Sequence, residues 1–214
     1  MPRENPTYIL FSNWQHTLQP FGIDQVGAEK AFNLLVAAYS TPNRHYHTLK
    51  HIHHVLNTIQ VLQGYSNNLT AVQIAAWFHD VVYDTEAKDN EQKSADYAVE
   101  FLSNLGISES IIAIVSRLIL NTKDHQAKVD DCDSQVLIDA DLAIFAANSV
   151  EYTKYARAIR QEYSWVPEAE YIVGRRQFLE RFLQRSHIYS TPLMLEFAEP
   201  SARGNIQGEI QSLG

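Results

Sequence analysis

The most concentrated chemistry in the chain is a run of histidines. Five of the nine histidines lie between positions 45 and 54, in the sequence RHYHTLKHIHH. On a helix, His47, His51 and His54 share one face, because residues three and four apart are neighbours. Such a face can bind a metal or transfer protons, but a partly exposed helix without any ligand has the same pattern. The segment needs partners from elsewhere in the chain to make a site.

A histidine and an aspartate interrupt an apolar run further along. His79 and Asp80 stand inside the sequence IAAWFHDVVYD, which begins at Ile74. Burial of an imidazole beside a carboxylate is costly unless each group is paired or bound to a metal. Together they are good ligands for a divalent cation such as Zn²⁺, Mn²⁺, Fe²⁺ or Mg²⁺. The alternative is a helix end at which the two side chains only cap the helix or form salt bridges.

A third apolar run contains two more acids. Asp139 and Asp141 lie in VLIDADLAIFAA, and Asp141 shares the expected inward face of a helix with Leu137, Ile138 and Ile144. Asp141 is therefore the candidate metal ligand, whereas Asp139 is expected to cap the helix or to support the site from behind. Three intrusions of histidine or aspartate into apolar helices favour one shared site over three unrelated accidents.

The elements that must position these residues are helices. No proline occurs between Pro42 and Pro167, and that span contains only Gly64 and Gly106. The apolar residues recur at spacings of three and four, which is typical of amphipathic helices. The sequence therefore predicts an all-α bundle. Its helices are expected at residues 7–18, 25–40, 47–63, 70–83, 91–105, 108–122, 134–147, 148–163, 168–187 and 192–199.

Length and charge limit the remaining possibilities. A chain of 214 residues fits one domain, expected over residues 1–200, with a polar tail at 201–214. The net charge of −8 argues against general nucleic-acid binding, and no apolar run is long enough to span a membrane. The N-terminal sequence lacks the features of a secretory signal, so a cytoplasmic location is expected. The single cysteine, Cys132, excludes disulfides and zinc sites built from cysteines.

The order of these residues resembles the pattern H…HD…D of the HD superfamily of metal-dependent phosphohydrolases. His51, the pair His79 and Asp80, and Asp141 stand in that order. The segment YHTLKH is similar to the YHxxxH segment of cyclic nucleotide phosphodiesterases in this superfamily, and IDADL is similar to its common DAD segment. The resemblance covers residues 45–145, with 148–199 as further helices packed on this core. It is greatest to the small bacterial predicted HD phosphohydrolases.

The resemblance implies an HD-domain helical bundle in which His51, His79, Asp80 and Asp141 bind a divalent metal ion, as Mn, Fe, Co, Zn or Mg. Such an ion would polarise a phosphoryl group and lower the pKa of a water molecule toward neutrality. His47 matches the phosphodiesterase histidine that protonates the leaving oxygen, although a surface histidine would have the same sequence pattern.

Further residues receive roles from the same resemblance. Asp84 matches the last acid of the HDxxED pattern of alarmone hydrolases and could orient the water, but Tyr83 replaces their glutamate. Lys123 and His125 are candidates for binding phosphate or a second metal, or for ordinary helix-end residues. Independently of the resemblance, Arg160 lies on a predicted C-terminal helix and could reach the site as a phosphate clamp, as could Arg157, Arg175 and Arg176. Surface salt bridges are the alternative interpretation of all four.

The function expected from the sequence is metal-dependent hydrolysis of a phosphate ester or anhydride, with a nucleotide as the favoured substrate class. Two alternatives stay open. A di-iron HD-type oxygenase would need two further histidines between the HD pair and the last aspartate, where the chain offers only His125. A non-catalytic protein that binds a metal or nucleotide would keep the same ligands. The expected partner is a small phosphorylated molecule, and a homodimer is left open.

Overall fold

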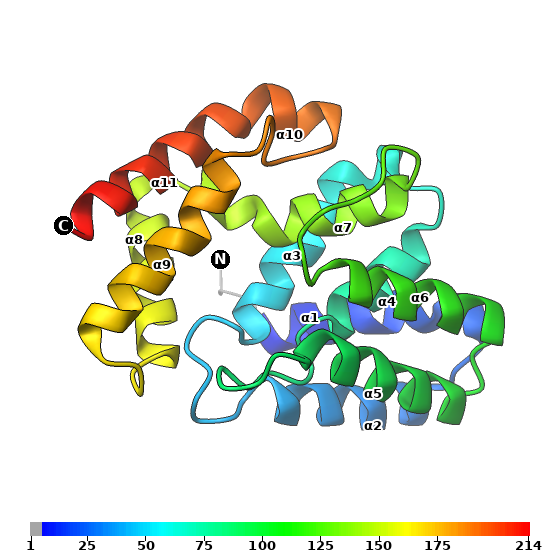
Figure 1. Cartoon of the computed structure of the whole chain (residues 1–214). Helices are drawn as coiled ribbons and strands as arrows, with labels where there is room; N and C mark the ends of the chain where they lie inside the picture. The colour runs from blue at the N-terminus through cyan, green and yellow to red at the C-terminus, as the bar shows by residue number, and fades with distance from the viewer. Residues whose placement is uncertain (1–5) are drawn as a thin grey trace, which may run out of the picture.

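The computed structural model describes residues 6–214, and all regular elements in this range are helical. Eleven α-helices and three short 3-10 helices follow one another there without a strand (Figure 1). The prediction of an all-α helical bundle is confirmed. No helix in residues 6–214 is both long enough and apolar enough to cross a membrane. The first five residues of the predicted 1–200 domain lie outside the described range.

Seven helices build the larger of two apolar cores. Helix α4 (Leu69–Phe78) lies at its centre with seven of its ten residues buried, as expected for a helix surrounded by others. Trp14 and Trp77 meet edge to face within this core, with ring centroids 5.5 Å apart. The helices around α4 are α1 (Pro6–Leu18), α2 (Gln25–Ala38), α3 (Leu49–Leu62), α5 (Asn90–Asn104), α6 (Glu109–Asn121) and α7 (Cys132–Asp141).

The C-terminal third forms a second apolar core. Phe145 and Phe182 meet edge to face in it, with ring centroids 5.1 Å apart. Helices α8 and α9 form a hairpin beside the first core, and α11 packs against α9 and the 3-10 helix that follows α7 (Figure 1). The elements of this part are η3 (Leu142–Ala146), α8 (Ser149–Glu162), α9 (Glu168–Leu183), α10 (Pro192–Phe197) and α11 (Glu199–Ser212).

The expectation of a loosely held polar tail over residues 201–214 is wrong, because most of this segment belongs to α11. Pro200 stands in the first turn of the helix, where its missing N–H costs no hydrogen bond. Ala202 and Ile206, four residues apart, are fully buried in the second core. Two apolar contacts on one helix face outweigh the polar composition of the segment.

Helix ends differ from the prediction at the places where the candidate ligands lie. The helix expected to reach residue 83 ends at Phe78, so His79 and Asp80 follow it directly. The helix expected over residues 134–147 changes to a 3-10 helix after Asp141. Side chains at such ends can turn toward a neighbouring helix without interrupting the hydrogen bonds of a helix interior.

A buried carboxylate ties the second core to α7. Asp139 accepts hydrogen bonds from the backbone N–H groups of Ser190 and Thr191, at 2.7–3.1 Å, and from the Thr191 hydroxyl at 2.6 Å. Burial raises the pKa of Asp139 to about 6, against the opposing effect of these hydrogen bonds. Asp139 therefore holds the loop before α10, as expected for a supporting residue. Its oxygens are used in these hydrogen bonds and it is not a candidate metal ligand.

We expect Ile206→Ala to lower the free energy of unfolding by about 2–4 kcal/mol, because the substitution leaves a cavity at a fully buried position. Gln207→Ala, at the exposed neighbouring position, is the matched control and should change it by less than about 0.5 kcal/mol. Urea unfolding followed by circular dichroism measures both. Equal, small effects would show that α11 is not part of the folded core.

Candidate metal centre

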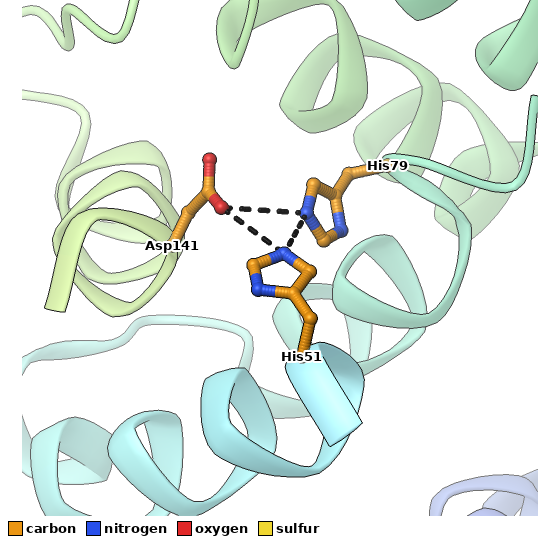
Figure 2. Close-up of side chains that lie close together, drawn as sticks. All are labelled: His51, His79 and Asp141. Atoms are coloured by element: carbon orange, nitrogen blue, oxygen red, sulfur yellow. Dashed lines mark hydrogen bonds and ion pairs between the residues drawn. The ribbon is translucent and has the colours of Figure 1, made fainter. Parts of the chain in front are cut away.

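Three helix ends bring His51, His79 and Asp141 together (Figure 2). His51 lies in the first turn of α3, His79 caps the C-terminal end of α4, and Asp141 is the last residue of α7. One ligand atom of each residue lies within 4.8 Å of the others, and the group could hold a metal ion. The structure thus assembles three of the four ligands that the sequence predicts.

The fourth predicted ligand stands beside this group. The Oδ2 atom of Asp80 lies 3.1 Å from His79 Nε2 and 3.5 Å from His51 Nε2. On the other side, Asp141 Oδ1 lies 3.3 Å from His51 Nε2 and 3.5 Å from His79 Nε2. Each carboxylate therefore approaches both imidazole nitrogens, but only Asp141 joins His51 and His79 in the group whose ligand atoms all lie within 4.8 Å of one another.

A hydrogen bond to the backbone orients the ring of His79 toward the cluster. Its Nδ1 donates a hydrogen bond to the backbone carbonyl of Ala76 at 2.9 Å, since a carbonyl can only accept. The Nε2 of a neutral ring then carries a lone pair, and it faces His51 Nε2 at 3.1 Å. A cation between these atoms and the two carboxylates satisfies all of them, and a divalent metal prefers this donor set.

The pKa values of His79 and Asp141 are shifted in opposite directions by their mutual contacts. Burial lowers the pKa of His79, but Asp80 and Asp141 outweigh it and hold the pKa well above its usual value. Burial raises the pKa of Asp141, but hydrogen bonds from His125, His51 and His79 hold it well below its usual value. The cluster therefore favours ionised carboxylates around a bound cation, which is a proton when no metal is present.

His125 approaches the other oxygen of Asp141. Its Nε2 lies 3.3 Å from Asp141 Oδ2, and the residue has a left-handed backbone with φ of 47°. Arg185 holds this backbone by donating hydrogen bonds to the carbonyls of Asp124 and His125 at 2.8 and 2.6 Å. A strained backbone held in this way is typical of functional positions. The structure thus brings the predicted residue His125 beside the candidate metal ligand Asp141.

His47 lies next to the cluster and is held by a residue that the sequence analysis did not assign to the site. Its Nδ1 lies 2.7 Å from Glu162 Oε2, and its Nε2 lies 4.0 Å from Asp80 Oδ2. Glu162 Oε1 also accepts hydrogen bonds from the backbone N–H groups of His45, Tyr46 and His47 at 2.7–3.0 Å. One carboxylate therefore fixes both the loop and the ring.

The hydrogen-bond donors around Glu162 lower the pKa of its carboxyl group. Burial raises its pKa, but the hydrogen bonds and charge of His47 and the backbone N–H groups outweigh burial and lower the pKa to about 2. A sequence signal for this residue exists. Glu162 continues the buried face of α8 formed by Tyr152, Tyr155 and Ile159, at helical spacing. An acid in such a series needs a buried partner, and that partner is the backbone of the 45–47 loop.

Arg44 is a second residue that the sequence analysis missed. Its guanidinium donates hydrogen bonds to the carbonyls of Asp80 at 2.7 Å, Val81 at 2.9 Å and His47 at 3.1 Å. The side chain is buried and joins the segment before α3 to the end of α4. Arg44 thereby fixes the backbone that carries Asp80 relative to His47.

The remaining predicted residues do not join the cluster. Asp84 is exposed, and its Oδ1 accepts a hydrogen bond from the backbone N–H of Glu86 at 2.9 Å. Arg160 is held in the α8–α9 turn by Glu168 at 2.9–3.0 Å and by backbone carbonyls. Lys123 is exposed and lines the cavity beside the cluster. Of the other arginines, Arg157 is exposed, and Arg175 and Arg176 bind Glu209 and the carbonyl of Gly214.

A cavity of about 550 Å³ opens beside the cluster. One part of the cavity is lined by His47, Asp80, His125 and Asp141, and another part by residues of the α8–α9 hairpin. The volume is that of a site for a small organic molecule. A ligand there would touch the candidate metal position and His47 together.

Comparisons with protein-family models, with curated proteins and with solved structures find no match for this chain. The resemblance of its motifs to the HD superfamily stays a prediction from the sequence. The case for a metal centre therefore depends on the geometry of the residues themselves.

We expect His51→Ala to lower the metal content of the purified protein by at least tenfold, because the variant removes one of two imidazole ligands. His54→Ala removes an exposed histidine from the same helix and should leave the metal content unchanged. Elemental analysis after purification without chelator measures both variants. Equal metal content in the two variants would contradict the ligand assignment.

Glu162→Gln should lower the free energy of unfolding at pH 7 by about 2–3 kcal/mol, since the folded pKa of about 2 lies below the ordinary value of 4.5. A depressed carboxyl pKa stabilises the fold above pH 4.5, and this contribution is lost as the pH falls toward 2. The difference between wild type and variant should shrink over the same range. Glu168→Gln, at an exposed carboxylate of the α8–α9 turn, is the control and should cost less than about 1 kcal/mol.

Urea titrations between pH 2.5 and 7 measure these differences. A cost for Glu162→Gln that does not change with pH would mean that the ionised carboxylate is not what holds the 45–47 loop.

Proposed function

We propose that the protein is a metal-dependent phosphohydrolase that cleaves a phosphate ester or anhydride of a small molecule, with a nucleotide as the favoured class. The observation that carries this proposal is the placement of His47. A histidine fixed by a buried carboxylate borders the same cavity as a cluster that could hold a metal ion. Hydrolysis of a phosphate ester needs these two parts, a centre of positive charge and a proton donor for the leaving oxygen.

The resident group proposed for the cluster is one divalent ion, as Mn, Fe, Co, Zn or Mg, held by His51, His79 and Asp141 with Asp80. Its positive charge would polarise a phosphoryl oxygen and lower the pKa of a water molecule. Asp80 and Asp141 supply the negative charge that retains a cation in this buried place. The carbonyl of Ala76 orients the ring of His79 through its Nδ1–H, so that Nε2 points to the cluster.

His47 is the proposed proton donor. Glu162 occupies its Nδ1, so Nε2 is left to face Asp80 and the cavity. Tyr83 lies against the imidazole, with ring centroids 4.1 Å apart, and donates a hydrogen bond to Glu162 at 3.2 Å. These contacts fix the ring so that Nε2 can give its proton to an oxygen leaving from the phosphate. The proposed place of action is the cytoplasm.

We expect His47→Gln to lower kcat for phosphate ester hydrolysis by about 10²–10⁴ without loss of metal, because it removes the proton donor and no ligand. Asp141→Asn should lower both metal content and kcat. Release of inorganic phosphate from a panel of nucleotides, measured with elemental analysis of the same samples, tests both variants. Full activity in metal-loaded His47→Gln would remove His47 from the mechanism, and activity in metal-free Asp141→Asn would place the reaction elsewhere.

A further inference from the structure

The cavity beside the metal cluster has walls of a particular chemistry. Seven tyrosine and phenylalanine side chains line it, and they come from the 45–47 loop, the segment after α4, η3, both helices of the α8–α9 hairpin and the turn between these helices. They are Tyr46, Tyr83, Phe145, Tyr155, Tyr163, Tyr171 and Phe178. Several of these rings support one another edge to face, as Tyr46 and Tyr155 do with centroids 4.7 Å apart. Such walls favour a flat, uncharged group through stacking and apolar burial.

The charged side chains around the cavity limit how many phosphate groups a ligand can carry. Among the described residues, two Lys and Arg side chains line the cavity, namely Lys123 and Arg175. Arg175 is already paired with both carboxylate oxygens of Glu209, at 2.8 and 3.1 Å, and its side chain is only 5% exposed. Glu91 and Glu170 add negative charge to the same lining. Of these two cations only Lys123 is left for a phosphate beyond the one at the candidate metal position, and the two glutamates oppose further negative charge there.

Gly174 provides the space between the aromatic walls. It lies on α9 between Tyr171 and Phe178, three and four residues away, so the three positions share one helix face. A Cβ atom added at Gly174 would meet no atom within 4 Å. Glycine is less favourable than alanine inside a helix, and packing does not require it here. The missing side chain instead keeps this part of the cavity open.

We infer that the cavity takes the flat, uncharged aromatic part of an ester that carries a single phosphate, and that Gly174 determines how large this part can be. The inference rests on the proposed function for the position of the phosphate. It adds the chemical class of the leaving group, and it excludes polyphosphates as preferred substrates.

The test uses the metal-loaded protein and two probes for the two halves of the substrate. 1-Naphthol probes the aromatic walls, and inorganic phosphate probes the metal cluster. Gly174→Leu fills the cavity, and Gly204→Leu is the matched control, because Gly204 is also a helical glycine whose Cβ would meet no atom within 4 Å. Isothermal titration calorimetry measures the affinity for each probe, and thermal unfolding confirms that the variants are folded. Gly174→Ala replaces the leucine variant if the latter does not fold.

We expect Gly174→Leu to weaken 1-naphthol binding at least tenfold and to leave phosphate binding unchanged, whereas Gly204→Leu changes neither. The wild-type protein should also hydrolyse 1-naphthyl phosphate with a kcat/KM at least tenfold above that for adenosine triphosphate. Unchanged naphthol binding in Gly174→Leu, or a preference for the triphosphate, would overturn the inference. If naphthol binds and Gly174→Leu abolishes this binding, but no ester is hydrolysed, the aromatic cavity stands and the proposed reaction is overturned.

Discussion

The constraint on which the site depends is the close approach of two buried imidazoles and two carboxylates at three helix ends. The Nε2 atoms of His51 and His79 lie 3.1 Å apart, with carboxylate oxygens of Asp80 and Asp141 beside them, and both histidines are buried. Unless a proton or a metal ion lies between them, lone pairs and negative charges at such distances repel one another in a medium of low dielectric constant. A cation at this point converts the repulsion into attraction, and three helix ends are positioned to provide its ligands (Figure 2).

The surroundings of this point follow a common rule, in which a buried carboxylate accepts hydrogen bonds from the backbone of a loop. Glu162 holds the 45–47 loop, Asp139 holds residues 190 and 191, and Glu199 holds residues 188 and 189. Asp133 holds residues 67 and 68, directly before α4. Each contact satisfies backbone N–H groups outside a helix and fixes a helix relative to its neighbour. Glu162 thereby fixes the segment before α3, which carries His51, whereas the C-terminal end of α4 with His79 and Asp80 is held by Arg44 through the carbonyls of Asp80 and Val81.

Local sequence patterns predict the features that depend on local spacing. Apolar spacing predicts the helices, and the interruption of apolar runs by His79 and Asp141 predicts two members of the cluster, because a buried charge needs a reason. The roles of Glu162 and Arg44 depend on partners up to 117 residues away, which no local pattern contains. The same limit explains why α11 is missed: a proline such as Pro200 is compatible with a helix end, but here it lies in the first turn of the next helix. Asp84 and Arg160 were singled out by motif and by charge, and near contacts in their own turns hold both outside the cluster.

The central claim is that one divalent ion lies between the two Nε2 atoms and the carboxylates of Asp80 and Asp141. Crystals of the protein loaded with Mn²⁺, Co²⁺ or Zn²⁺ and measured on both sides of the absorption edge of the metal would test it most directly. The account predicts one anomalous peak at about 2.0–2.2 Å from His51 Nε2, His79 Nε2 and an oxygen of Asp141. A peak elsewhere, or a cluster without a peak in crystals grown with excess metal, would contradict it.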